Sequence, residues 1–365
     1  MAAHSSPPLV SVVTPVYNGE EFLAECIESV LGQTYQNLEY VIVDNQSKDR
    51  SLEIARNYAQ RDARIRVLTT PQFYRKGTDS WNNAVRQMSP QAKYCKILHA
   101  DDWLFPQCLE RMVQVAEAHP SIGVVSSYRL CNRMLDCDGL PYPSSFVAGR
   151  EVSRHYLLGN IFVFGSPSTT LLRSDLVRAR GDLYILYTGT DSNEYLTDME
   201  VCLNFLQQSD FGFVHEVLSF TRIHETSVTS ELARTGQLHN IPEFLHILKN
   251  YGPVFLTPEE QKARADSLLR DYHRALAMDM VLGRNDVVAR QQKLLEGLGL
   301  PISRSKLWLI AAGMGIKALL RPPVNGLRLL AARRSARLKP VAKERKKVGT
   351  SHPPVAKTVS TSSAD

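Results

Sequence analysis

The chain has 365 residues, 44% of them apolar, which is enough for one core of about 200–250 residues and a smaller appendage. Six cysteines without a CxxC pair, and no basic-then-apolar leader in residues 1–8, exclude a secreted disulfide framework and predict a cytoplasmic protein with reduced thiols. The net charge of +6 is unevenly distributed: residues 301–365 carry +12 and residues 1–300 carry −6. No aromatic residues interleave the basic run 333–347, which excludes a nucleic-acid partner.

The first hundred residues alternate between apolar strands and short amphipathic helices. Strands are predicted at 9–13, where Pro15 ends the first one, and then at 40–43, 65–68 and 94–98. Helices are predicted between them at 20–31, 52–59 and 79–88. This alternation predicts an α/β fold made of parallel βαβ units with right-handed crossovers.

Polar side chains follow three of these strands. The first strand leads into Thr14, Pro15, Tyr17 and Asn18, the second into Asp44, and the fourth into Asp101 and Asp102. Parallel strands bring these ends to one edge of the sheet, where open α/β folds bind their ligands. Paired carboxylates there suit Mg²⁺ or Mn²⁺. The alternative is that Asp102 merely caps a helix that starts near Pro106.

The residue types at this edge suit a nucleotide. Tyr17 offers a flat face for a base, and Asp44 can accept hydrogen bonds from a base or a ribose. The chain has neither a G-x-G-x-x-G turn after the first strand nor a P-loop. A metal ion is therefore expected to neutralise the phosphates.

Four segments together resemble the family 2 glycosyltransferases, which are inverting enzymes with a GT-A fold. They are residues 12–18, 29–35, 43–49 and 99–104, and the resemblance extends over roughly residues 8–230. It implies a central mixed, mostly parallel sheet and a nucleoside-diphosphate-sugar donor. It also implies that Thr14, Pro15, Tyr17, Asn18 and Asp44 surround the donor nucleotide, with Asp101 near the ribose and sugar. Asp102 would then bind Mn²⁺ or Mg²⁺.

The chain departs from the family pattern at two positions. The family often has a carboxylate where this chain has His99, so His99 is not expected to be a metal ligand. Asn82 stands where the family often has an arginine, so no phosphate contact is assigned to that helix.

A candidate general base lies in the second half. The segment 195–200 opens a helix predicted from Val201 to Leu206, so Asp198 lies at the N-terminus of this helix. The family places its acceptor-side carboxylate in such a segment. The alternative is a helix cap, because an aspartate there satisfies free N–H groups. Asp191 and Glu194 remain rivals for the base, and Glu200 is expected to be a supporting residue or an exposed helix carboxylate.

An Arg-x-His tripeptide follows two predicted strands, 211–214 and 217–220. The tripeptide is common in these transferases, so Arg222 is a candidate for the diphosphate and His224 for the metal or the diphosphate. The alternative for His224 is a hydrogen-bonded structural role.

The predicted organisation has five parts. They are a disordered N-terminus (1–8), the GT-A domain (9–230), a helical extension (231–300), a basic amphipathic region (301–340) and a disordered tail (341–365). The apolar stretch 307–316 is too short to span a bilayer, but with the arginines that follow it could hold the protein on the inner face of an anionic membrane. The alternative is a helix packed on the catalytic domain.

Two functions follow. The first is metal-dependent, inverting transfer of a single sugar to a hydroxyl of a glycan or lipid-linked acceptor, in polysaccharide or glycolipid biosynthesis. The second is a non-catalytic protein of the same fold that binds nucleotide-sugars, or nothing, and acts as a membrane-associated scaffold. Retention of Asp44, Asp101, Asp102 and Asp198 together favours the enzyme, because a scaffold does not need all four carboxylates.

Overall fold

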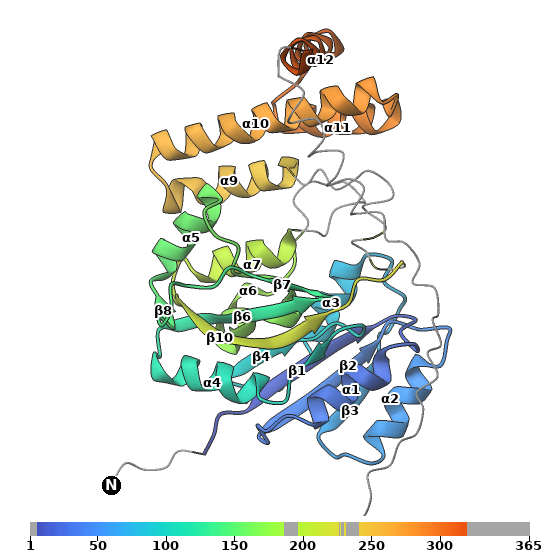
Figure 1. Cartoon of the computed structure of the whole chain (residues 1–365). Helices are drawn as coiled ribbons and strands as arrows, with labels where there is room; N and C mark the ends of the chain where they lie inside the picture. The colour runs from blue at the N-terminus through green and yellow to red at the C-terminus, as the bar shows by residue number, and fades with distance from the viewer. Residues whose placement is uncertain (1–5, 186–195, 226, 228–229, 231–240, 320–365) are drawn as a thin grey trace, which may run out of the picture. The chain divides into compact units, whose positions relative to one another are not determined.

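The computed structural model describes residues 6–185, 196–225, 227, 230 and 241–319. Its first part is the predicted alternation of strands and helices (Figure 1). In chain order these elements are β1 (Val10–Val16), α1 (Leu23–Leu31), β2 (Leu38–Asp44), α2 (Ser51–Ala59), β3 (Ile65–Thr69), α3 (Gly77–Val85) and β4 (Tyr94–Ile97).

Strand β1 is longer than predicted. It continues through Pro15 to Val16, and Pro15 is in register with Val43 of β2. On its other side β1 pairs with β4 only from Val10 to Val13. The missing proline N–H therefore falls beyond the part of β1 that has neighbours on both sides, which is why the proline is tolerated there.

The middle of the chain adds shorter elements. They are β5 (Trp103–Leu104), α4 (Cys108–Ala118), β6 (Ile122–Cys131), β7 (Met134–Asp136), β8 (Phe146–Val147), α5 (Gly149–Leu158), the 3₁₀ helix η1 (Pro167–Thr169), β9 (Leu171–Arg173), α6 (Ser174–Arg180), α7 (Thr197–Phe205) and β10 (Asp210–Thr221). The two strands predicted at 211–214 and 217–220 are one strand, β10. Its pairing with β6 shifts register between Val214 and Val217, which explains the break in the sequence pattern.

The strands form one mixed sheet in the order β3-β2-β1-β4-β9-β6-β10-β5, with β7 beside β6 and β8 beside β10. The four most extensive pairings are parallel: β6 with β10, β1 with β2, β2 with β3, and β1 with β4. Because β1, β2 and β4 are parallel neighbours, the residues that follow them lie at one edge of the sheet, as predicted.

Two hydrophobic clusters lie on the two faces of the sheet. One contains the buried faces of α1 and α4, and the other those of α3, α5, α6, α7 and α9 (Figure 1). All six cysteines are buried and unpaired, in agreement with the prediction of reduced thiols. The sheet edge that carries the polar residues is thus held from both sides by packed helices.

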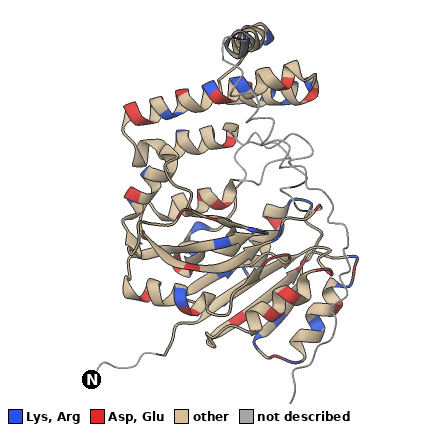
Figure 2. Cartoon of the chain, viewed as in Figure 1, with Lys and Arg blue, Asp and Glu red and all other residues tan. Residues whose placement is uncertain are grey.

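In residues 241–319 the helices are α9 (Ile241–Phe255), α10 (Pro258–Val281), α11 (Asn285–Gly297) and α12 (Arg304–Leu319). Helix α10 begins at a capping box in which Thr257 and Glu260 exchange hydrogen bonds. Acidic and basic side chains are interspersed along α10 (Figure 2). Residues 1–311 form one compact unit, and α12 continues past it. Among the described residues, no helix has both the length and the apolar character that crossing a membrane requires.

Candidate active site

The turn after β4 brings His99 next to the two aspartates. The Asp102 backbone N–H donates to the His99 carbonyl at 3.1 Å, so the first and fourth residues of the turn lie side by side. Ligand atoms of His99, Asp101 and Asp102 all lie within 4.8 Å of one another, and these three residues form a group that could hold a metal ion. The sequence-based argument against His99 as a ligand is therefore not supported by the geometry.

Asp102 is buried and incompletely satisfied. Its side chain is 2% exposed, and Oδ1 accepts a hydrogen bond of 2.9 Å from the Arg222 backbone N–H. Oδ2 makes no hydrogen bond of ordinary geometry to the described residues, although the Ser168 side chain lies close enough to lower the pKa of Asp102, and Nε2 of His99 makes no hydrogen bond either. Burial, and then the nearby Asp101 carboxylate, raise the pKa of Asp102 to about 6. A buried carboxylate with a free oxygen beside a second carboxylate fits a divalent cation, which would replace the lost solvation.

The structure excludes the alternative in which Asp102 caps the next helix. Helix α4 begins at Cys108, its N-cap residue is Gln107, and no side-chain hydrogen bond caps it. Asp102 lies well before this helix.

Arg222, which follows β10, forms hydrogen bonds with the turn that contains Asp101 and Asp102. The Arg222 Nε donates to the Asp101 carbonyl at 3.1 Å, and its guanidinium lies over the Phe22 ring and pairs with Glu25. Arg222 therefore holds the turn through its backbone and side chain, whereas its predicted contact with phosphate stays a prediction. His224 Nε2 lies 3.1 Å from Asp101 Oδ2 and is not in the group of three.

The residues predicted to surround the nucleotide have two different environments. Tyr17 is 48% exposed, and its ring lies 5.0 Å from that of Phe73, which is 46% exposed. Asp44 is buried, and its carboxylate accepts from the Ser47 backbone N–H at 3.2 Å. Thr14 is fully buried, and its hydroxyl lies 3.0 Å from that of Tyr40, so its contacts are internal.

The loop ends around Tyr17 are held by side-chain-to-backbone hydrogen bonds. Asn18 has a positive φ of 50°, and its Oδ1 accepts from the Lys48 backbone N–H at 2.8 Å. Pro15 is buried within β1. These two residues therefore shape the backbone next to Tyr17.

Sequence reasoning missed Phe73 and the residue that places it. The Asn45 side chain forms hydrogen bonds of 2.8 and 2.9 Å with the backbone carbonyl and N–H of Tyr74. Asn45 directly follows β2, so the end of β2 also fixes the loop that carries Phe73. The sequence shows an asparagine at a strand end, but it does not show that the side chain bonds to a residue 29 positions later.

Asp198 lies in the first turn of α7. The N-cap residue of this helix is Leu196, and no side chain caps it, so Asp198 does not act as the N-cap. Burial raises the pKa of Asp198 to about 6, and the nearby His99 and Arg129 oppose this rise. The electrostatic influence of His99 on both Asp102 and Asp198 connects the metal-binding group to the candidate base. The rival bases Asp191 and Glu194 lie outside the described residues.

A family model described as glycosyl transferase family 2 matches residues 11–209, more than half of the chain. The chain belongs to glycosyl transferase family 2. An uncharacterized glycosyltransferase of Rickettsia typhi is 26% identical over 295 residues, covering 76% of this chain and 87% of that protein. An uncharacterized glycosyltransferase of Haemophilus influenzae is 27% identical over 226 residues, covering 61% and 82%.

Solved structures share the fold of this family 2 glycosyltransferase. Residues 1–349 of S. aureus TarS in complex with UDP-GlcNAc superpose with a TM-score of 0.58 at 14% identity, covering 80% of this chain and 82% of that one. The mannosyltransferase PcManGT of Pyrobaculum calidifontis, in complex with GDP-Man and Mn²⁺, gives 0.50 at 16% identity, covering 91% and 86%. The predicted GT-A fold, with its mixed, mostly parallel sheet and C-terminal helices, is thereby confirmed.

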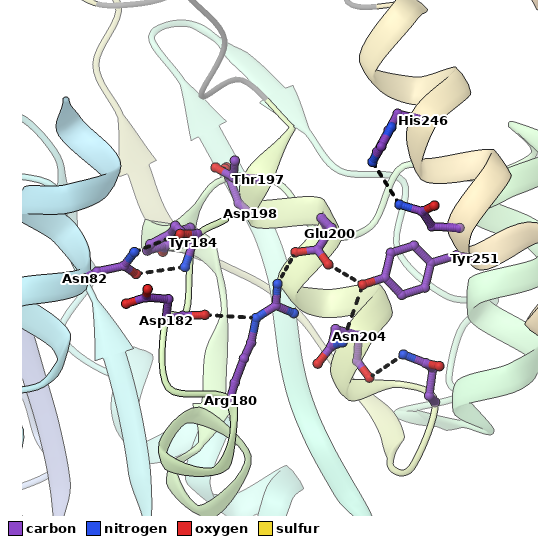
Figure 3. A network of polar contacts seen from close by, with 12 residues as sticks. Asn82, Arg180, Asp182, Tyr184, Thr197, Asp198, Glu200, Asn204, His246 and Tyr251 are labelled. Carbon is purple, nitrogen blue, oxygen red and sulfur yellow. Dashed lines mark hydrogen bonds and ion pairs between the residues drawn. The ribbon is translucent and has the colours of Figure 1, made fainter. Parts of the chain in front are cut away.

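In this transferase Asn82 has a structural contact in place of the family's arginine. Its amide forms two hydrogen bonds with the Tyr184 backbone, of 2.7 Å to the carbonyl and 2.8 Å from the N–H (Figure 3). Asn82 is buried, and it joins α3 to the segment that follows α6. No phosphate contact is needed to explain it.

Glu200 was expected to be a supporting residue or an exposed carboxylate, and the structure excludes exposure. It is 1% exposed, forms an ion pair of 2.5 Å with Arg180, and accepts a hydrogen bond from the Tyr251 hydroxyl (Figure 3). These contacts join α6, α7 and α9. Glu200 therefore anchors the helix that carries Asp198.

Breaking this network is expected to destabilise the fold. Glu200→Ala leaves the Arg180 guanidinium, itself 6% exposed, without its carboxylate, and should lower the free energy of unfolding by about 3–5 kcal/mol. Tyr251→Phe removes one hydrogen bond and should cost about 1–3 kcal/mol. Urea denaturation of both variants measures these values. If neither variant lowered the free energy of unfolding measurably, the role of Glu200 in anchoring the helix would be contradicted.

Proposed function

We propose that the chain is an inverting, metal-dependent glycosyltransferase that moves a single sugar from a nucleoside-diphosphate-sugar to an acceptor hydroxyl. The observation that carries this proposal is the buried Asp102 carboxylate with a free oxygen, beside Asp101 and His99 at the end of β4. The nucleotide-sugar complexes of TarS and PcManGT, which share the fold, support it. Burial of the Asp44 and Asp102 carboxylates costs free energy of folding. A scaffold has no need of these carboxylates, which is an argument against that alternative.

The residues divide into a donor side and an acceptor side. Tyr17 and Phe73 offer an exposed aromatic pair for the base, and Asp44 lies at the neighbouring strand end. Asp101 and Asp102 would hold Mn²⁺ or Mg²⁺, and a bound ion would stabilise the charge that develops on the departing nucleoside diphosphate.

Asp198 is proposed as the general base. An inverting transfer needs one base that takes the proton from the acceptor hydroxyl while the hydroxyl attacks the sugar. A carboxylate whose pKa is raised to about 6 is still ionised at neutral pH and is a stronger base than an exposed aspartate. We propose a glycan or lipid-linked acceptor, and thus a role in polysaccharide or glycolipid biosynthesis.

Thermal-shift measurements with nucleoside diphosphates and their sugars, with and without Mn²⁺, test the proposal. A ligand that binds only the folded state at 100 times its dissociation constant stabilises it by about 2.7 kcal/mol. We expect at least one nucleoside diphosphate to raise the melting temperature, and to do so more strongly with Mn²⁺. No shift with any of them would contradict the proposal.

We further propose that the enzyme is cytoplasmic and binds the surface of an anionic membrane through residues 301–340, of which 320–340 lie outside the described residues. In α12, Leu307 is fully buried, whereas Trp308 and Leu309 are 57% and 74% exposed. The helix therefore packs inward at Leu307 and still presents apolar side chains outward. The 14 Lys and Arg of residues 301–365 match the charge of an anionic surface.

Replacing Arg333, Arg334 and Arg337 by Gln in the full chain is expected to release it from anionic vesicles. Each basic residue near such a surface contributes about 1 kcal/mol, so the triple variant should bind roughly 100-fold more weakly. Co-sedimentation at low salt with vesicles containing phosphatidylserine measures this, with neutral vesicles as the control. Equal sedimentation of both proteins, or binding that ignores lipid charge, would contradict the proposal.

A further inference from the structure

The ring of His99 is held in one place by aromatic contacts. It stacks on Trp81 with ring centroids 5.1 Å apart and an interplanar angle of 29°. The edge of Tyr184 contacts the same Trp81 at 5.4 Å. The His99 backbone is fixed as well, because its N–H donates to Ser168 Oγ at 3.2 Å. Such a fixed side chain is preorganised for a ligand.

One nitrogen of this ring has no partner in the part of the chain that the structure describes. Nε2 of His99 is buried without a hydrogen bond, in the same turn as the buried, free Oδ2 of Asp102. Two buried polar atoms without partners in neighbouring residues call for a common explanation, since each one costs free energy.

A single ion bound between the two residues would satisfy both atoms. Ligand atoms that bind one ion at about 2.1 Å are at most about 4.2 Å apart. One ligand atom each of His99, Asp101 and Asp102 lies within 4.8 Å of the other two, so a movement of these side chains would close them on one ion. The donor atoms that these three residues offer are therefore nitrogen and oxygen, not carboxylate oxygens alone.

We propose that His99 is a nitrogen ligand of the metal and gives the site a preference for Mn²⁺ over Mg²⁺. This inference rests on the proposed function and names its metal. Mg²⁺ strongly prefers oxygen ligands, whereas first-row transition ions accept imidazole. Replacing a carboxylate by an imidazole also lowers the negative charge that a hard ion such as Mg²⁺ requires.

His224 serves the site differently. Its Nε2 lies 3.1 Å from Asp101 Oδ2, within hydrogen-bond distance of a carboxylate. A histidine in this position orients a ligating carboxylate. His99 and His224 thus form a matched pair: two histidines at one site, of which only His99 is in the metal-binding group.

The experiment uses the full chain with MnCl₂ and no nucleotide, so that donor binding does not enter the result. Mn²⁺ affinity is measured by electron paramagnetic resonance, and Mg²⁺ affinity by competition. Electron spin echo modulation then reports whether an imidazole nitrogen binds the Mn²⁺. The variants are His99→Phe, which keeps a ring on Trp81, His99→Asp, and His224→Phe. Melting temperatures in EDTA verify that each one is folded.

We expect wild type and His224→Phe to show nitrogen modulation and His99→Phe to lack it. Loss of the ligand should weaken Mn²⁺ binding at least about tenfold, since even loss of an orienting residue costs 10–100-fold. His99→Asp should retain metal, lose the nitrogen signal and lower the ratio of Mn²⁺ to Mg²⁺ affinity.

Nitrogen modulation that persists in His99→Phe and disappears in His224→Phe would overturn the assignment. So would unchanged Mn²⁺ affinity in His99→Phe. If Asp102→Asn still abolished binding in that case, the proposed function would stand without His99. If wild type bound no Mn²⁺ without nucleotide, this inference would be overturned, whereas the proposed function would still be decided by the Mn²⁺-dependent thermal shift with a nucleoside diphosphate.

Discussion

Asp102→Asn is expected to abolish metal-dependent binding of nucleoside diphosphates while the protein stays folded. The amide keeps the shape of the side chain but removes the charge that attracts the ion. The measurement is the Mn²⁺-dependent rise in melting temperature with a nucleoside diphosphate, which should vanish in the variant. Asp175→Asn is the matched control, because this exposed aspartate of α6 pairs with Arg173 at the end of β9 and is not part of the turn.

The same variant should be more stable than wild type when no metal is present. The Asp102 carboxyl binds its proton more tightly in the folded state, where its pKa is about 6, than in the unfolded state, where it is 3.8. The free energy of unfolding of wild type therefore falls as pH rises from about 4 to about 6. The full penalty is on the order of 3 kcal/mol at neutral pH, and an asparagine avoids it.

Urea denaturation in EDTA at pH 7 and at pH 4 checks the sign. The variant should gain stability over wild type at pH 7, and the difference should shrink at pH 4. Donor binding that is the same in both proteins with Mn²⁺ and with EDTA would contradict the metal assignment, whatever the stability shows.

Asp198→Asn is expected to bind the donor normally and to lose on the order of 100-fold or more in turnover. An asparagine cannot accept the proton of the acceptor hydroxyl, so a general base of typical efficiency is lost. Turnover is followed as release of the nucleoside diphosphate, with the donor that the thermal-shift measurements identify. Binding is followed by the melting-temperature shift, which should be unchanged.

The pH profile separates a base from a structural residue. Because burial raises the pKa of Asp198 to about 6, wild-type turnover should fall as pH drops through about 6, where the base becomes protonated. This fall in turnover toward acidic pH should be absent from the residual activity of Asp198→Asn. The control is Glu200→Gln, two residues further along the same helix. It should change the free energy of unfolding, but its turnover should still fall as pH drops through about 6. Near-native turnover of Asp198→Asn would instead implicate Asp191 or Glu194.

The strands and helices before β5 could be predicted because their signals are local. Apolar runs of four or five residues separated by amphipathic segments specify βαβ units, and the regular handedness of the crossovers brings the ends of β1, β2 and β4 together. Errors arose where a local signal was outweighed by pairing: Pro15 lies inside β1, and the break at residues 215–216 is a register shift within β10.

The predictions for the site divide in the same way. The positions of Asp44, Asp101 and Asp102 followed from strand ends, and the chemistry of carboxylates suggested the metal. Glu200 could not be predicted to be buried, because its partners are Arg180 and Tyr251, 20 and 51 residues away. Phe73 was missed because the contact that places it runs from Asn45 across two elements.

The sequence by itself determined the family, the α/β architecture and the cluster of carboxylates at one sheet edge, because these depend on short-range patterns and on invariant crossover geometry. Only the tertiary structure decided which charged groups are paired and which are left free. The backbone N–H of Arg222, 120 residues away in the sequence, donates to Oδ1 of Asp102, and Oδ2 of Asp102 makes no hydrogen bond to the described residues. Trp81 stacks on His99 in the same turn. Burial sets the pKa of Asp102 and Asp198, and burial depends on segments that meet only when the whole sheet has formed.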